Sequence, residues 1–189
     1  MKNLLLFLLL LAAVGCKTVQ PPNFTPTEVG FATEKADADL RSIAVSYAQP
    51  AEQTGKVRVA YIERFLGTSL TPVWKEALND ALVRSAIFSD NSTKKVSLLV
   101  KITEFDPPSA GITFETPISA KYEIIDRENG AVVFTTQIQT FGKCEMSHDF
   151  VGAVRSVEAM NRGVQQNIIE FIQQLEGAEL NKELIPGRE

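Results

Sequence analysis

The sequence predicts an α/β (α+β) domain in which a mixed, mainly antiparallel sheet of four to five strands carries two helices packed on one face. Segments with apolar residues at every second position alternate with two longer segments of helical periodicity, in the order strand, helix, three strands, helix. An Asn-Gly turn lies between the last two strands, so that pair is antiparallel. The length of 189 residues fits one such domain with an appendage.

The N-terminus has the pattern of an export signal. Lys2 precedes an unbroken run of eleven apolar residues, 4–14. This run is too short for a membrane-spanning helix, which needs about twenty residues, but it suits the hydrophobic region of a signal peptide, about 7–15 residues. We therefore expect residues 1–15 to be a signal peptide that is removed.

The end of this run, Ala13-Val14-Gly15-Cys16, resembles the lipobox of bacterial lipoproteins. The resemblance implies cleavage before Cys16 and acyl chains (diacylglycerol and an N-linked chain such as palmitate) on this residue, so Cys16 is the predicted lipidation site and membrane anchor. Ala13 stands where the motif prefers Leu, and an ordinary secretory signal is the alternative. In well-studied Gram-negative lipoproteins, Asp after the cysteine favours inner-membrane retention. Lys17 occupies that position here, so we expect an outer-membrane anchor facing the periplasm.

The segment after the anchor is expected to be a tether. Residues 16–38 contain three prolines, several threonines and no sustained apolar period, which is typical of a flexible linker. About 22 flexible residues would hold the domain roughly 25 Å from the lipid. A single periplasmic domain is expected over residues 39–176, with a flexible charged tail over residues 177–189.

Two early segments are expected to be strands. Residues 41–48 fit either a helix face or a strand, and the strand is favoured because Pro50 closes the segment and few good helix formers lie within it. Residues 57–63 alternate apolar and other side chains, which predicts a further strand.

The first long helix is expected over about residues 72–87. Thr71 supplies an N-cap, Pro72 suits the first helical position, and apolar residues then recur at helical spacing. Trp74 lies on the apolar face, where a core role is more common than a ligand platform.

The last helix is predicted over about residues 150–175, with Asp149 as its cap and Ser147 as an equal alternative. Gly163 in its interior indicates close packing, because glycine weakens a helix by about 1 kcal/mol relative to alanine. Glu158 and Arg162, four residues apart, are expected to form a solvated ion pair.

Three strands are predicted between the helices, around residues 96–102, 118–124 and 132–138. Asn129-Gly130 is the best hairpin signal in the chain. One side of the last strand is rich in Thr and Gln, so one face of the sheet is expected to meet water or a partner. The residues on that side are Thr135, Gln137 and Gln139.

Reactive side chains concentrate only before the last helix, at Cys144, Glu145, His148 and Asp149. A thiolate there beside His148 would be a nucleophile, with Asp149 orienting the imidazole. Sequence neighbours rarely have this geometry, so we favour a turn in which Cys144 is packed as a small apolar residue and His148 is exposed. The chain has one histidine and no phosphate-binding or nucleophile-elbow motif, so we expect no catalytic residue, no cofactor and no metal.

The stretch Thr71-Pro72-Val73-Trp74 and residues 149–155, continuing to Asn167-Ile168, resemble small periplasmic lipoproteins that accompany envelope transport and assembly systems. These include auxiliary lipoproteins of ABC-type lipid transport and the lipoprotein partner in lipopolysaccharide assembly. Some members carry an acyltransferase label, but no acyltransferase residues occur here. The resemblance covers about residues 57–175 and implies a non-enzymatic binding, scaffold or accessory module with an envelope protein as partner.

Two other functions remain open at this point. One is a carrier that holds a lipid or another apolar ligand between the sheet and the helices, and the other is a hydrolase or acyltransferase that uses Cys144 and His148. The formal net charge of −4 gives no general attraction to nucleic acid, which needs a clustered basic surface. Oligomeric state is not predicted.

Overall fold

The computed structural model describes residues 19–180 and 184–185. The predicted signal peptide and the Cys16 lipidation site therefore lie outside the described residues. The elements, in chain order, are β1 (Asp39–Tyr47), the short 3₁₀ turn η1 (Pro50–Glu52), α2 (Ala60–Leu66), α3 (Leu70–Ser85), β2 (Lys95–Phe105), β3 (Phe114–Asp126), β4 (Val132–Cys144) and α4 (Gly152–Leu175). Within the described part of the chain, no helix combines the length and the hydropathy that crossing a bilayer requires.

The four strands form one sheet in the order β1-β2-β3-β4. β1 is parallel to β2, because α3 carries the chain back between them, and the other two pairs are antiparallel. The hairpin predicted at Asn129-Gly130 is confirmed, and Gly130 has the left-handed φ of 74° that the turn requires. Its loop is longer than a two-residue turn, since Asp126 and Ala131 are the residues whose backbones pair across it. The mixed, mainly antiparallel sheet is thus as predicted.

The strand predicted over residues 57–63 is wrong. Val57 makes one isolated parallel bridge to Phe105, and the chain then forms α2, which ends at Gly67 with a φ of 66°. The ambiguous segment at residues 41–48 forms the edge strand instead, as β1. Because β1 pairs with β2 as far as Ile102, the chain after η1 bonds the end of β2 that remains, first at Thr103 and then at Phe105.

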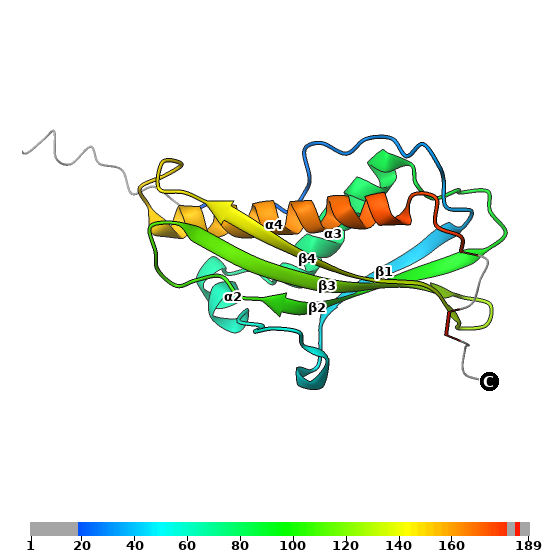
Figure 1. Ribbon diagram of the computed structural model, residues 1–189, viewed down its shortest axis with the longest axis horizontal. Helices are drawn as coiled ribbons and strands as arrows, with labels where there is room; N and C mark the ends of the chain where they lie inside the picture. The colour runs from blue at the N-terminus through cyan, green and yellow to red at the C-terminus, as the bar shows by residue number, and fades with distance from the viewer. Residues whose placement is uncertain (1–18, 181–183, 186–189) are drawn as a thin grey trace, which may run out of the picture.

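The two long helices cover the same face of the sheet, as predicted, and α2 lies at the end of the sheet where β2 finishes (Figure 1). α4 lies over β3 and β4, whereas α3 packs against β1 and α4. Both helices start two residues from the predicted positions. α3 has Ser69 rather than Thr71 at its N-cap, and α4 begins after Val151, whose N–H bonds the Asp149 carboxylate at 2.8 Å.

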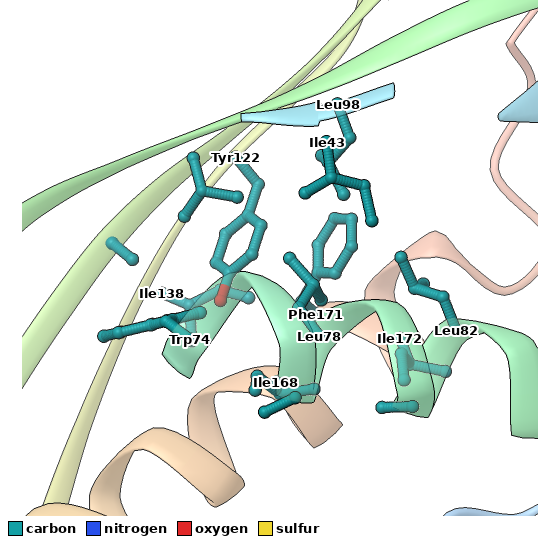
Figure 2. Packing of buried hydrophobic residues seen from close by; sticks show 14 of the residues in the cluster. Ile43, Trp74, Leu78, Leu82, Leu98, Tyr122, Ile138, Ile168, Phe171 and Ile172 are labelled. Atoms are coloured by element: carbon teal, nitrogen blue, oxygen red, sulfur yellow. The ribbon is translucent and has the colours of Figure 1, made fainter. Parts of the chain in front are cut away.

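The space between sheet and helices is filled by side chains (Figure 2). Tyr122 from β3 stacks on Phe171 from α4, with ring centroids 4.1 Å apart. The Tyr122 hydroxyl donates to Asn167 Oδ1 at 2.8 Å, and burial raises the pKa of this phenol. Trp74 is fully buried as predicted, and its ring and that of Phe24 form a T-shaped pair with centroids 6.1 Å apart. A ligand held between the sheet and helices, as the carrier hypothesis supposed, would have to displace these rings.

The outer face of β4 is polar, as predicted. Thr135, Gln137 and Gln139 are exposed, while Phe134 and Ile138 on the other face pack into the core. The two long helices leave this face of the sheet uncovered (Figure 1), and the η1 turn contacts it through the ion pair of Glu52 with Lys101.

The segment predicted as a flexible tether is largely part of the domain, so that prediction is wrong for residues 22–38. Phe24 is fully buried against Trp74, and Arg84 donates to the Pro26 carbonyl at 2.6 Å. Backbone bonds from Ala32 and Ala36 then join the segment to the end of α3. The apolar residues of this segment are too few to recur at a regular spacing. Each of them packs singly against a surface that other elements form, so the sequence shows no strand or helix pattern.

The tail is also ordered where the structure describes it. Leu180 is buried in the core, and Ile185 bridges to Val132 at the start of β4. The prediction of a flexible tail is therefore wrong for these positions.

Candidate functional site

A pocket of about 580 Å³ opens at the end of the domain where β2 finishes and α4 begins. Three segments that are distant in sequence form its walls: α2, residues 107–111 of the loop between β2 and β3, and the first turns of α4. Its volume lies within the range of small-ligand pockets. The apolar lining residues include Phe65, Leu66, Pro107, Ala153 and Met160.

Arg58 is the one charged residue among those that line the pocket. Its guanidinium forms an ion pair with the Asp106 carboxylate, so its charge is already compensated. The remaining polar lining side chains are hydroxyls: Tyr61, Ser109 and Ser156. This composition suits an uncharged apolar group, because a charged ligand would have no opposite charge to replace its hydration.

Glu63 holds α2 in position beside the pocket. Its carboxylate accepts three hydrogen bonds: from the Tyr47 hydroxyl at 2.7 Å, the Ser69 hydroxyl at 2.9 Å and the Leu70 N–H at 2.8 Å. Burial raises the pKa of Glu63, but these three bonds outweigh it and hold the pKa below its ordinary value. Glu63 thus links α2 to β1 and accepts the N–H of Leu70, the first residue of α3, where the sequence predicted a cap at Thr71.

Arg155 links the two loops at the pocket rim. This side chain is buried, and it donates to the carbonyls of Asp149 at 2.6 Å, Phe150 at 3.3 Å and Gly111 at 3.1 Å. Its guanidinium also lies 5.3 Å from the centre of the Phe114 ring. Arg155 therefore ties the loop between β2 and β3 to the start of α4.

The hydrogen-bonding role of Arg155 is not among the predictions from the sequence. The sequence does contain a signal for it. Residues at a spacing of four from Arg155, namely Ala159, Gly163 and Asn167, all lie on the buried side of α4, as Arg155 does. A charged residue in line with buried positions on a helix indicates an internal hydrogen-bonding role.

The structure confirms the favoured interpretation of the turn before α4. Cys144 is fully buried with Phe114 and Ala159, and burial raises the pKa of its thiol. His148 is exposed, and the Asp149 carboxylate bonds the Val151 N–H. A buried, protonated thiol and a solvent-exposed imidazole do not make a nucleophilic dyad.

The other candidate residues behave as structural groups. Glu158 and Arg162 form the predicted ion pair at 2.7 Å on the surface of α4. In the described ranges, 19–180 and 184–185, no cluster of three or more His, Cys, Asp or Glu side chains could hold a metal ion. The site that the structure does assemble is the apolar pocket, which no sequence pattern predicts because its walls come from three separate segments.

The sequence matches no protein-family model and no curated protein. Solved structures of bacterial proteins are similar to it to different degrees. Protein XCC0632 from Xanthomonas campestris, of the DUF330 family, has a TM-score of 0.55 at 12% identity, covering 85% of this chain and 96% of that chain. Protein CT253 from Chlamydia trachomatis has a TM-score of 0.49 at 11% identity, covering 75% and 97%.

A minor lipoprotein from Acinetobacter baumannii has a TM-score of 0.38 at 12% identity, covering 82% of this chain and 98% of that chain. Of the three similarities, the one to the Xanthomonas protein is strong enough to establish a shared fold, and at this identity it establishes the fold alone. The α+β fold described here is therefore shared with this bacterial protein over most of both chains.

Proposed function

We propose that this protein is a lipid-anchored bacterial envelope lipoprotein that acts as a non-enzymatic accessory module in envelope transport or assembly. The lipobox resemblance at Cys16 supports the anchor, and the recurrence of the fold in a bacterial protein is consistent with such a role. The proposed binding site is the pocket between α2 and α4, and its occupant is an apolar group of an envelope protein.

The composition of the pocket is the observation that carries the binding role. Its walls are apolar, and its one charged lining residue, Arg58, is paired with Asp106. The reactive groups of the neighbouring turn point to no reaction, since Cys144 is buried and His148 lies in solvent. A site of this kind binds by burying apolar surface, which contributes about 25 cal/mol per Å².

Photo-crosslinking in intact cells tests this function. Phe65, which lines the pocket, is replaced with p-benzoylphenylalanine, and the same replacement at Phe31 is the control, since Phe31 is exposed and lies outside the lining. We expect a discrete adduct with an envelope protein from position 65 and none from position 31. No adduct, or the same adducts from both positions, would contradict a specific site.

The anchor has its own test. Replacing Cys16 with Ser removes the atom that carries the diacylglycerol, so the protein should move from the membrane fraction to the periplasmic fraction. Membrane retention of the acyl-free protein would contradict the anchor.

A second candidate function is a carrier of a lipid or another apolar ligand, favoured by the apolar lining and the volume of the pocket. Extraction of the purified protein with organic solvent, followed by mass spectrometry, should then release a ligand. Ala153→Phe places a ring in the pocket and should abolish co-purification, while Val83→Phe on the exposed side of α3 should leave it unchanged. A ligand that persists in Ala153→Phe would exclude this pocket as its site.

A further inference from the structure

Exposed apolar side chains gather at the end of the domain that holds the pocket. Of the eleven large apolar side chains that are exposed on the described residues, six lie on α2 and on the two loops beside the pocket. We call them the apolar rim: Tyr61, Phe65, Ile112, Met146, Phe150 and Val151. Phe150 is 86% exposed, Tyr61 75% and Ile112 74%. Such a concentration indicates a contact surface, whereas single exposed apolar residues do not.

The N-terminal segment leads toward this same end. The Asn23 N–H donates to Asn161 Oδ1, and the Asn23 carbonyl accepts from Gln165 Nε2, each at 2.9 Å. The chain at Asn23 therefore runs in the same direction as α4, and the residues before it lie toward the first turn of the helix. Figure 1 agrees, since the start of the blue segment lies beside the beginning of α4.

The length of the chain limits where this segment begins. The four residues from Asn23 back to Val19 cover at most about 13 Å. This equals the rise of about nine helical residues, which is the separation between Asn161 and Gly152 on α4. Val19 is partly buried against the core, so the segment is held to the domain up to this point.

Little chain remains between the domain and the predicted anchor. Cys16 lies three residues before Val19, which corresponds to at most about 11 Å. The headgroup layer on one side of a bilayer is roughly 5–8 Å thick. The tether of about 25 Å expected from the sequence does not exist, because residues 22–38 pack on the domain. An anchor at Cys16 therefore holds the start of α4 close to the lipid.

Several charged groups near the apolar rim have partners within the domain. Arg58 pairs with Asp106, Lys143 pairs with Glu145 at 3.0 Å, and buried Arg155 is bonded by carbonyls. Contact with lipid at this end therefore leaves these groups with their partners inside the domain. Tyrosine and phenylalanine side chains are also favoured in the interfacial region of bilayers.

We propose that the apolar rim rests on the bilayer to which Cys16 is anchored, with Phe150, Tyr61 and Ile112 in the interface between headgroups and acyl chains. This inference rests on the proposed function in one respect, namely that Cys16 carries acyl chains. It adds an orientation: α4 begins at the membrane, and the pocket opens beside the lipid. The occupant of the pocket then comes from the bilayer or from a protein within it.

Fluorescence in lipid vesicles tests the orientation. Full-length acylated protein carrying Phe150→Cys is labelled with the environment-sensitive fluorophore NBD and reconstituted in vesicles of phosphatidylethanolamine and phosphatidylglycerol. The Cys16 thiol is blocked by its lipid and Cys144 is buried, so the label reaches position 150. The matched control is Phe31→Cys, because Phe31 is 84% exposed and precedes Ala32, which is bonded to the last residue of α3. Ile112→Cys provides an independent rim position.

Lipids with a spin label near the headgroup should quench the label at positions 150 and 112 at least about threefold more than the label at position 31. If the variants float with the vesicles but all three labels are quenched equally, the anchor stands and the membrane contact is wrong. If no variant floats, the anchor itself fails and both proposals fall. Shielding of position 150 that appears in native envelope membranes, but not in lipid vesicles, would assign the rim to a protein partner and overturn the inference.

Discussion

Gly142 on β4 and Gly163 on α4 lie directly against each other. A Cβ built on Gly163 would stand 2.9 Å from the Gly142 nitrogen, and one built on Gly142 would stand 2.5 Å from the Gly163 nitrogen and 1.8 Å from the Ala159 carbonyl oxygen. The Thr140 hydroxyl completes the contact by donating to the Gly163 carbonyl at 2.9 Å. Helix and strand therefore meet backbone to backbone, which confirms the close packing predicted at Gly163 and explains why both positions are glycine.

Replacement of these glycines should destabilise the fold by different amounts. Gly142→Ala meets backbone atoms that cannot move aside, and we expect a loss of about 3 kcal/mol in the free energy of unfolding. Gly163→Ala should cost less, about 1–2 kcal/mol, because alanine favours the helix and part of the clash is with the flexible Ile118 side chain. Gly30→Ala, with no atom within 4 Å of the added Cβ, is the control. Urea unfolding measures all three, and a Gly142→Ala protein as stable as the control would contradict this packing.

Removal of the Arg155 guanidinium should loosen the pocket rim. Arg155→Met keeps much of the side-chain volume but leaves the carbonyls of Gly111, Asp149 and Phe150 without their donor, for which we expect a loss of about 3 kcal/mol. Hydrogen exchange should quicken in residues 109–113 and 148–151. Arg162→Met, at an exposed ion pair with Glu158, should cost less than about 1 kcal/mol. Equal effects of the two substitutions would show that Arg155 does not hold the loops together.

Glu63 should make stability depend on pH in the acidic range. Because its pKa in the folded state lies below its ordinary value of 4.5, ionised Glu63 stabilises the fold above that value, and the contribution is lost as the pH falls through the folded-state pKa. Glu63→Gln should therefore lower the Tm most at about pH 7, and the difference from the parent should shrink toward about pH 3.5. Glu76→Gln, at an exposed position on α3, is the control. A constant difference across this range would exclude the carboxylate as the stabilising group.

The Cys144 thiol should react slowly in the folded protein. In a Cys16→Ser background it is the one remaining thiol of the two cysteines, and burial both shields it and raises its pKa. A thiol reagent should modify it at least about 100-fold more slowly in native conditions than in denaturant. His148→Ala should leave the native rate unchanged. Rapid native labelling that His148→Ala slows would restore the dyad hypothesis.

The sequence alone determined the elements whose burial pattern is local. Alternation in β2, helical periodicity in α3 and α4, and the turn at Asn129-Gly130 each predicted the element that forms. The Thr- and Gln-rich face of β4 and the packed Cys144 were predicted in the same way. These predictions hold because the spacing of apolar residues within one element shows which side of that element faces the core. The other segments need not be known for this inference.

Tertiary structure decided the rest. Residues 57–63 alternate like a strand, but β1 already occupies the edge of β2, so the chain forms α2. Phe24 lies in a proline-rich segment without a regular spacing of apolar residues. It is buried because it packs against Trp74 of α3 in the core. The pocket and its rim arise where α2, residues 107–111 and the start of α4 meet. No local sequence pattern predicts that these three segments lie together, because their contact depends on how far each of them extends past the end of the sheet.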